Sequence, residues 1–75
     1  MKETLMYVVG ALCEHPEAVK IGVNEDGNVL RFKLTLESDD RGRVIGREGR
    51  VIKSLRTILQ AMAASQNKRV YLDIE

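Results

Sequence analysis

The most constraining feature of the sequence is a strict alternation of side chains over residues 30–37. Leucine or phenylalanine occupies every even position of this segment, and a charged residue or threonine occupies every odd position. Because successive side chains of a strand point to opposite faces, the pattern predicts a strand with one buried and one solvated face. The rest of the chain must therefore supply partner strands and a layer that covers the buried face.

Two further strands are predicted, one before and one after this segment. Residues 19–23 alternate in the same way, and the Asp26-Gly27 pair that follows favours a hairpin because glycine accepts a positive φ. Residues 69–74 alternate again, after Asn67, a residue type that ends helices in the left-handed conformation. The sequence thus predicts an antiparallel hairpin and a separate third strand.

Helices are predicted where apolar residues recur at a period of 3.6. The first helix covers residues 2–14 and stops at His15, because the residue before a proline is pushed out of the helical region. The longest helix covers residues 50 to about 64, and a short helical turn at residues 41–45 precedes it. Residues 38–40 offer side-chain oxygens that we expect to cap this short turn.

The predicted order of elements is helix, strand, strand, short helix, helix, strand. Two helices separate the second and third strands, so these strands need a crossover connection. We expect an α+β fold in which helices pack on one face of a three-stranded sheet. Seventy-five residues, of which 44% are apolar and 31% charged, are enough for one small globular domain, spanning residues 1–75.

Several classes of protein are disfavoured by the sequence. No apolar run approaches the roughly 20 residues of a membrane span. The amino terminus lacks the features of a secretion signal, so we expect a cytoplasmic location. The single cysteine, Cys13, and the single histidine, His15, cannot supply a disulfide or a usual zinc site. We therefore expect no metal and no cofactor.

The net charge of +1 hides an uneven distribution along the chain. Residues 1–40 carry four Lys or Arg against eight Asp or Glu, whereas residues 41–56 carry six against one. A basic block on an acidic body is typical of a local site for a polyanion. On charge alone, a solvated helix face is the commoner explanation of such a charge run, and for Arg41 and Arg56 it is the favoured interpretation.

The basic block contains two glycines separated by two residues, in the segment Gly46-Arg47-Glu48-Gly49. Such glycines allow a ligand to approach the backbone closely, and a following helix begins with amides that attract an anion. The spacing matches neither a dinucleotide fingerprint nor a nucleoside-triphosphate loop, and no catalytic nucleophile with its base is evident, so we expect no enzyme. The segment instead predicts a phosphate cradle. Its cations are Arg43, Arg47, Arg50 and Lys53.

Residues 44–52, Val-Ile-Gly-Arg-Glu-Gly-Arg-Val-Ile, resemble the signature of the KH domain, in which Val-Ile-Gly leads into a Gly-x-x-Gly loop and an isoleucine-bearing helix. The predicted order, α-β-β-α-α-β, is similar to the type II KH arrangement of bacterial proteins and covers essentially the whole chain. With no flanking domain, the chain resembles the small single-domain bacterial KH proteins of the KhpA (YlqC-like) family. The resemblance implies that single-stranded RNA is the ligand.

Within the loop, the resemblance implies that Gly46 and Gly49 admit the RNA backbone and that Arg47 contacts a phosphate. We expect the amides of Gly49 and Arg50 to complete the phosphate site. Glu48 departs from the family pattern, since a carboxylate in the middle of the loop repels phosphate. Near a helix start it also stabilises the free protein by about 0.3–1 kcal/mol, so Glu48 is either tolerated or weakens binding.

Outside the loop, the resemblance assigns Val44, Ile45 and Ile52 to an apolar groove for the bases and to its support, although ordinary core packing explains these residues at least as well. Arg31 and Lys33, on the solvated face of the alternating strand, either extend the binding track or merely discourage aggregation at a strand edge. Aromatic residues make up only 4% of the chain, so we expect no stacking platform and low sequence specificity.

The resemblance further implies an RNA chaperone or post-transcriptional regulator, linked in some bacteria to cell elongation and cell wall homeostasis. It also implies a homodimer, or a heterodimer with a larger KH-domain protein of the KhpB type. Pairing is physically reasonable, because so small a domain buries little surface and one KH loop contacts few nucleotides. The alternative is a KH-fold dimerisation or protein-interaction module in which Glu48 marks a weak or lost RNA site.

Overall fold

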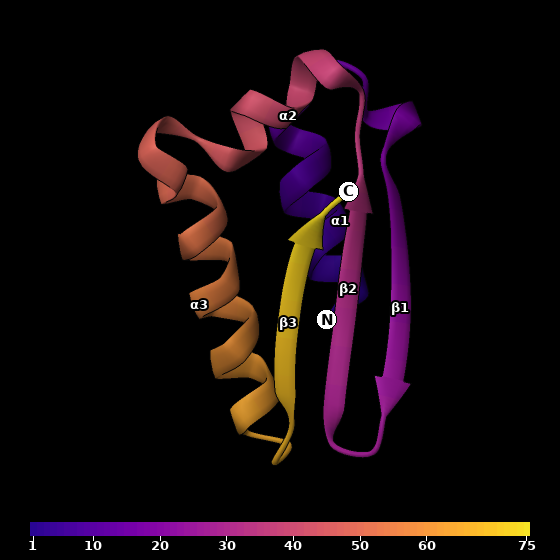
Figure 1. Cartoon of the computed structure of the whole chain (residues 1–75), viewed down its shortest axis with the longest axis vertical. Coiled ribbons are helices and arrows are strands. Elements are labelled where there is room, and N and C mark those ends of the chain that lie inside the picture. Colours follow the sequence, from indigo (N-terminus) through magenta and orange to yellow (C-terminus); the bar gives the residue numbers. More distant parts are fainter.

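The alternating segment forms the central strand of a three-stranded mixed sheet. In the computed structural model, which describes residues 1–75, this segment is β2 (Val29–Thr35). Strand β1 (Lys20–Asp26) pairs with it antiparallel on one side, and β3 (Arg69–Ile74) pairs with it parallel on the other, as Figure 1 shows. Burial alternates along β2 as predicted, with the side chains from Leu30 to Leu34 turned into the core at every second position.

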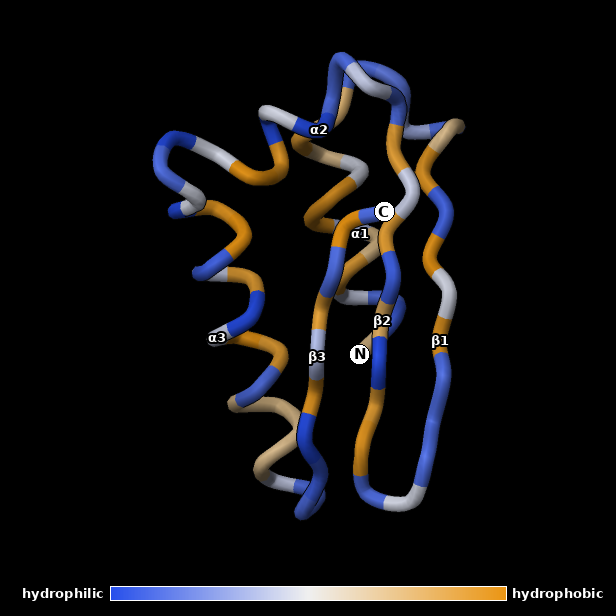
Figure 2. The backbone as a smooth tube through the Cα atoms, in the orientation of Figure 1, coloured by the Kyte–Doolittle hydropathy of each residue, from blue (hydrophilic) through white to orange (hydrophobic).

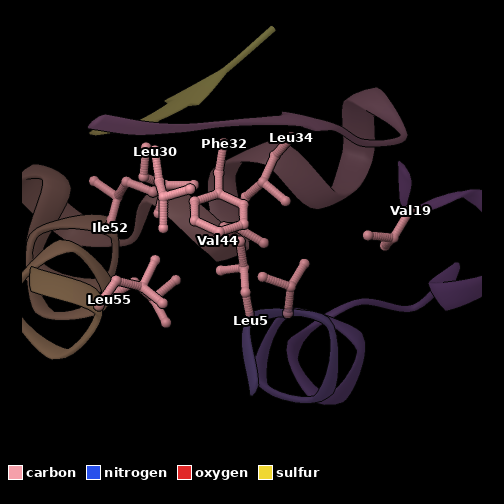
Figure 3. Close-up of a cluster of buried hydrophobic side chains, with 11 residues drawn as sticks. Leu5, Val19, Leu30, Phe32, Leu34, Val44, Ile52 and Leu55 are labelled. Atoms are coloured by element: carbon pink, nitrogen blue, oxygen red, sulfur yellow. The ribbon is translucent and has the colours of Figure 1, made fainter. Parts of the chain in front are cut away.

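Three α-helices cover one face of this sheet: α1 (Lys2–Leu12), α2 (Ser38–Ile45) and α3 (Arg50–Ala64). In Figure 3 the buried side chains of β2 point toward α1 and α3, and Val44 of α2 lies among them. The predicted α+β fold, its order α-β-β-α-α-β and its covered sheet face are confirmed. None of the helices has the length and apolarity that crossing a membrane requires. The core cluster consists of Leu5, Val9, Val19, Leu30, Phe32, Leu34, Val44, Ile52, Leu55, Leu59 and Leu72.

Two residues that the sequence places in turns, Gly27 and Asn67, adopt the positive φ expected of them. Gly27 has a φ of 61° in the two-residue turn of the β1–β2 hairpin, and Asn67 has a φ of 58° after α3. Glycine and asparagine are the residue types that reach this left-handed region most readily. The crossover through α2 and α3 then returns the chain beside β2, which makes β3 parallel to it.

Helix α1 ends two residues earlier than predicted. Cys13 already has extended backbone angles, with φ −92° and ψ 147°, and a 3-10 turn at Pro16–Ala18 follows. The cause lies far along the chain, because the carboxylate of Asp40 accepts hydrogen bonds from the backbone amides of Glu14 (2.9 Å) and His15 (3.0 Å). These bonds hold the chain in a non-helical path, so proline is not the only reason that the helix stops.

Asp40 therefore does not cap its own helix, contrary to the sequence-based expectation. Helix α2 begins three residues earlier than predicted, at Ser38, with Glu37 at its N-cap and no side-chain cap. Asp40 is then the third residue of the first turn rather than a residue that precedes the helix, and it is 1% exposed. The bond from the Glu14 amide, assisted by the His15 amide, lowers the pKa of Asp40 against the opposing effect of burial. We call this contact the Asp40 clasp.

Candidate nucleic-acid interface

The two crossover helices meet in a tight turn in which three of the four residues have a positive φ, and which is the 3-10 segment Arg47–Gly49 preceded by Gly46. Gly46 has a φ of 78°, Glu48 of 57° and Gly49 of 73°. In Figure 2 this turn is a hydrophilic stretch between the hydrophobic end of α2 and the hydrophobic start of α3, at the end of α3 that lies away from the β1–β2 hairpin. The turn is therefore a polar corner of the molecule, and its backbone relies on glycine at two positions.

The two glycines of the turn have different structural roles. A Cβ on Gly46 would lie 2.5 Å from Cγ2 of Val51 and 2.9 Å from its backbone nitrogen, which real side chains do not tolerate. A Cβ on Gly49 would meet no atom closer than 3.9 Å. Gly46 thus allows the end of α2 to contact the first turn of α3, whereas the space over Gly49 is open to a ligand.

The backbone amides that we expected to hold phosphate are occupied within the turn. The amide of Gly49 donates to the carbonyl oxygen of Gly46 at 3.1 Å, and the amide of Arg50 donates to that of Arg47. A phosphate would have to replace these bonds rather than find bare donors. The positive side chains around the turn are better placed to bind an anion.

Three of the four predicted cations lie exposed around the turn. Arg47 and Arg50 belong to the turn and its junction with α3, and the Cε of Lys53 lies 3.9 Å from the position of a Cβ on Gly49. The Arg50 guanidinium is 3.8 Å from the Glu48 carboxylate, and both side chains are about three-quarters exposed, at 77% and 74%. Such an exposed pair is weak, so Arg50 stays available to a polyanion.

Arg43 differs from the other three cations. Its Nη2 lies 2.7 Å from Oε1 of Glu14, which places it in an ion pair between α2 and the segment after α1. Half of the Arg43 side chain remains exposed. An incoming phosphate would therefore compete with Glu14 for this guanidinium.

The apolar residues beside the turn support it from within. Val44 is fully buried and Ile52 is 6% exposed, and both belong to the core. Ile45 is half-buried and packs against the edge of the core. These side chains anchor the helices on either side of the turn, and only Ile45 retains appreciable exposure.

A surface groove of about 600 Å³ runs between α3 and the edge strand β3. Two side chains of α3 bind the open edge of that strand. Nε of Arg56 donates to the carbonyl oxygen of Leu72 at 3.0 Å, and the amide of Val70 donates to Oε1 of Gln60 at 3.1 Å. Arg56 is therefore not simply part of a solvated helix face, because it links α3 to β3. The groove is lined by Arg56, Thr57, Gln60, Ala61, Ala64, Val70, Tyr71, Leu72 and Asp73.

Sequence reasoning missed this groove because its two walls come from separate parts of the chain. One signal was present. A stripe of polar and small residues at helical spacing lies on α3, opposite the apolar stripe that enters the core. It consists of Lys53, Thr57, Gln60, Ala61 and Ala64. Alanine in such a stripe leaves room for a flat ligand beside the helix.

Neither Cys13 nor His15 shows the environment of a reactive group. Burial raises the pKa of the Cys13 thiol, and the negative charge of Asp40 raises it further, so the thiolate is disfavoured. The imidazole of His15 lies 3.7 Å from the Glu17 carboxylate on the surface. No group of three or more His, Cys, Asp or Glu side chains is arranged to hold a metal ion.

A mixed sheet in the order α-β-β-α-α-β, with a glycine-hinged turn between the two crossover helices, is the architecture of the type II KH domain. Comparison with known proteins identifies the family within that class. The family model described as "KhpA/KhpB, KH domain" matches residues 2–74. The chain belongs to this KhpA/KhpB family of KH domains, which confirms the resemblance noted in residues 44–52.

Individual relatives match over nearly their whole length. The chain is 40% identical over 74 residues to "RNA-binding protein KhpA" of Halalkalibacterium halodurans, which covers 99% of this chain and 97% of the relative. The protein of the same name from Oceanobacillus iheyensis is 39% identical and covered to 99%, and that from Chlamydia trachomatis is 40% identical and covered to 95%. All three are named for binding RNA and none for a reaction, in agreement with the prediction of a non-enzymatic protein.

Proposed function

We propose that this protein binds single-stranded RNA, with the RNA backbone passing the turn at residues 46–49 and the bases entering the groove between α3 and β3. The observation that carries the proposal is the continuity of the exposed cations with the groove. Arg47, Arg50 and Lys53 surround the turn, and Arg56 stands one helical turn further along α3, at the groove itself. The names of the relatives support RNA as the polyanion.

Binding in this proposal depends on side-chain charge more than on backbone amides. Each phosphate neutralised on a single strand steepens the salt dependence of log K by about 0.7. Three cations acting together therefore contribute about 2 to the slope of log K against log salt. Near 0.1 M salt this corresponds to about 100-fold in affinity. The groove offers few aromatic surfaces, so base preference is weak.

The direct test removes the charge of the turn without disturbing the fold. The variant Arg47→Gln/Arg50→Gln/Lys53→Gln is compared with Arg41→Gln, an exposed cation of α2 that lies before the turn. Anisotropy titrations of a labelled single-stranded RNA at several salt concentrations should show about 100-fold weaker binding for the triple variant and a slope reduced by about 2. Equal affinities for the triple variant and Arg41→Gln would refute the proposal.

The triple variant also distinguishes RNA binding from the alternative, a KH-fold interaction module with a weak or lost RNA site. The observation that favours the alternative is Glu48, whose exposed carboxylate stands among the cations of the turn. Crosslinking to cellular RNA should succeed for the unmodified protein and fail for the triple variant. Substitution of Gly46 is unsuitable as a control, because its added Cβ would collide with Val51.

We further propose that the protein works as a homodimer, or with a larger KH-domain partner of the KhpB type, as a cytoplasmic RNA chaperone or post-transcriptional regulator with a link to cell elongation and cell wall homeostasis. A matching family model that spans both KhpA and KhpB supports such pairing. Exposed apolar side chains, among them Tyr7 at 80% and Ile58 at 50%, offer surface for it. Sedimentation that shows only monomer at high micromolar concentration would contradict the homodimer.

A further inference from the structure

The face of the sheet turned away from the helices carries exposed cations. Figure 1 views the molecule from this side, with α1 behind the sheet. Residues 1–40 contain only four Lys or Arg, and three of them, Lys20, Arg31 and Lys33, alternate with inward-facing residues and so lie on this outer face. Of the eight acidic residues in the same part of the chain, only Asp26 shares the face. Strand β3 adds Arg69 and Asp73 to the same face, and the Glu75 carboxylate reaches it by accepting a hydrogen bond from the Thr35 hydroxyl at 3.0 Å, so the cations of the face are only slightly in excess.

Protection of a strand edge does not explain these cations. Arg31 and Lys33 belong to β2, which is the central strand of the sheet and has both edges paired. Charges that discourage edge-to-edge aggregation belong on edge strands. Neither residue takes part in an ion pair, although Asp73 of β3 stands beside Lys33 in the strand register. The two charges are therefore free to meet a ligand.

Arg31 is also held in position. Its guanidinium carbon lies 4.9 Å from the centre of the Tyr71 ring, on the neighbouring strand β3, and the Tyr71 side chain is 43% exposed. A guanidinium stacked in this way keeps its N–H groups available in the plane, where phosphate oxygens and base edges bind. The pair offers one stacking surface in a chain with few aromatic residues.

A hollow of about 410 Å³ lies beside this pair. It forms because Gly22, which has no side chain, pairs with Lys33 across the β1–β2 ladder. Asp73 lines both this hollow and the groove between α3 and β3, and Tyr71 lines the groove while contacting Arg31 in the hollow. The groove and the hollow therefore meet across β3.

We propose that single-stranded RNA leaving the groove crosses β3 and continues over the outer face of the sheet, where Arg31 and Lys33 bind its phosphates and a base stacks on the Arg31–Tyr71 pair. This second track rests on the proposed RNA binding at the turn and lengthens its site beyond the roughly four nucleotides that a KH loop contacts. RNA is the occupant favoured here because the free cations are continuous with the groove and include a stacked guanidinium.

The test compares a short and a long RNA. Variants Arg31→Gln/Lys33→Gln and Tyr71→Leu are titrated with oligonucleotides of about five and about 15 nucleotides. The control is Lys2→Gln/Arg41→Gln, which removes the same charge from exposed positions off the outer face. The Arg31/Lys33 variant should bind the long RNA about 20-fold more weakly, with a salt slope reduced by about 1.4, and should bind the short RNA like the control. Tyr71→Leu should weaken the long RNA by about fivefold or more at an almost unchanged slope.

The outcomes separate this inference from the proposal on which it rests. If the Arg31/Lys33 variant and the control bind the long RNA equally while the triple variant of the turn fails to bind, the second track is overturned and the turn remains the RNA site. If the triple variant binds both oligonucleotides normally, RNA binding at the turn is itself refuted. An equal loss on both RNA lengths would mean that Arg31 and Lys33 belong to the short site, and it would also overturn the second track.

Discussion

The two ends of α2 use charged residues in opposite ways. At its start, the Asp40 clasp buries a carboxylate and satisfies it with two backbone amides. At its end, the turn after Ile45 exposes Arg47 and Glu48, and the nearest ion pair, between Glu48 and Arg50, is loose. A charge that is satisfied within the chain therefore stabilises the fold, whereas a charge left without a firm partner is available to a ligand.

The largest expected change in stability is at Gly46, which follows the end of α2 and begins the turn. Gly46→Ala should lower the free energy of unfolding by about 3 kcal/mol, because the new Cβ combines a positive φ with overlap against Val51. Gly49→Ala should lower it by only about 1 kcal/mol, since its φ is strained but its space is open. Urea denaturation of both variants measures the difference. Similar losses for the two would mean that the glycines share one role.

The next effect concerns the Asp40 clasp. Asp40→Asn should lower the melting temperature by about 10 °C at neutral pH, because an amide cannot accept both hydrogen bonds. RNA affinity of the folded variant should stay within about twofold of the unmodified protein, since the clasp lies away from the exposed turn. A large loss of RNA affinity in a variant that is still folded would mean that Asp40 also contributes to RNA binding, contrary to the difference described between the two ends of α2.

The clasp also predicts a dependence of stability on pH. The pKa of Asp40 is lowered in the folded protein, so its contribution is fully present above the ordinary pKa of an aspartate, about 3.9, and is lost as the pH falls through the folded value. The difference in unfolding free energy between the unmodified protein and Asp40→Asn should therefore shrink as the pH is lowered from about 5 to about 2. Denaturant titrations at several pH values measure this, and a constant difference would exclude the ionised clasp.

A smaller effect is expected at the exposed end of α2. Glu48→Lys should tighten binding of single-stranded RNA by about fivefold to tenfold and steepen the salt slope by about 0.7, because it removes a repulsive charge and adds an attractive one. Stability should change by less than about 1 kcal/mol, since the Glu48 side chain is 74% exposed. A filter-binding titration tests this, with Glu17→Lys as a control on an exposed residue away from the turn. No difference between the two variants would argue against phosphate contact at the turn.

The smallest effect belongs to the ion pair that joins the two regions. Glu14→Gln releases Arg43 from its partner and should tighten RNA binding by no more than about threefold. Both side chains are about half exposed, so stability should fall by only about 0.5 kcal/mol. Anisotropy titration of this variant beside Glu14→Gln/Arg43→Gln measures the contribution of the freed guanidinium. Equal binding by the single and double variants would place Arg43 outside the RNA site.

Much of the fold followed from patterns that extend over a few neighbouring residues. The alternation at residues 30–37 predicted β2 and its buried face, and Asp26-Gly27 predicted the hairpin turn. What escaped prediction was the earlier end of α1 at Leu12 and the groove against β3. Both depend on contacts between distant segments, which no local periodicity reports.

The candidate site shows the same limit. The sequence predicted which residues surround the turn, but it did not reveal that the amides of Gly49 and Arg50 are occupied within it. It also left Arg31 with two interpretations, one of which required an edge strand. The order of strands, with β2 in the centre, removes that interpretation.

The sequence by itself determined the elements, the glycine-hinged turn and the position of the basic block, because helix period, strand alternation and positive φ are properties of adjacent residues. Only the tertiary structure decided which charged groups find a partner within the chain and which do not. Asp40 binds amides 25 and 26 positions away, and Arg43 pairs with Glu14 across 29 positions. Such partners come together only when the shared core has formed, and the cations that find none are the ones left on the surface.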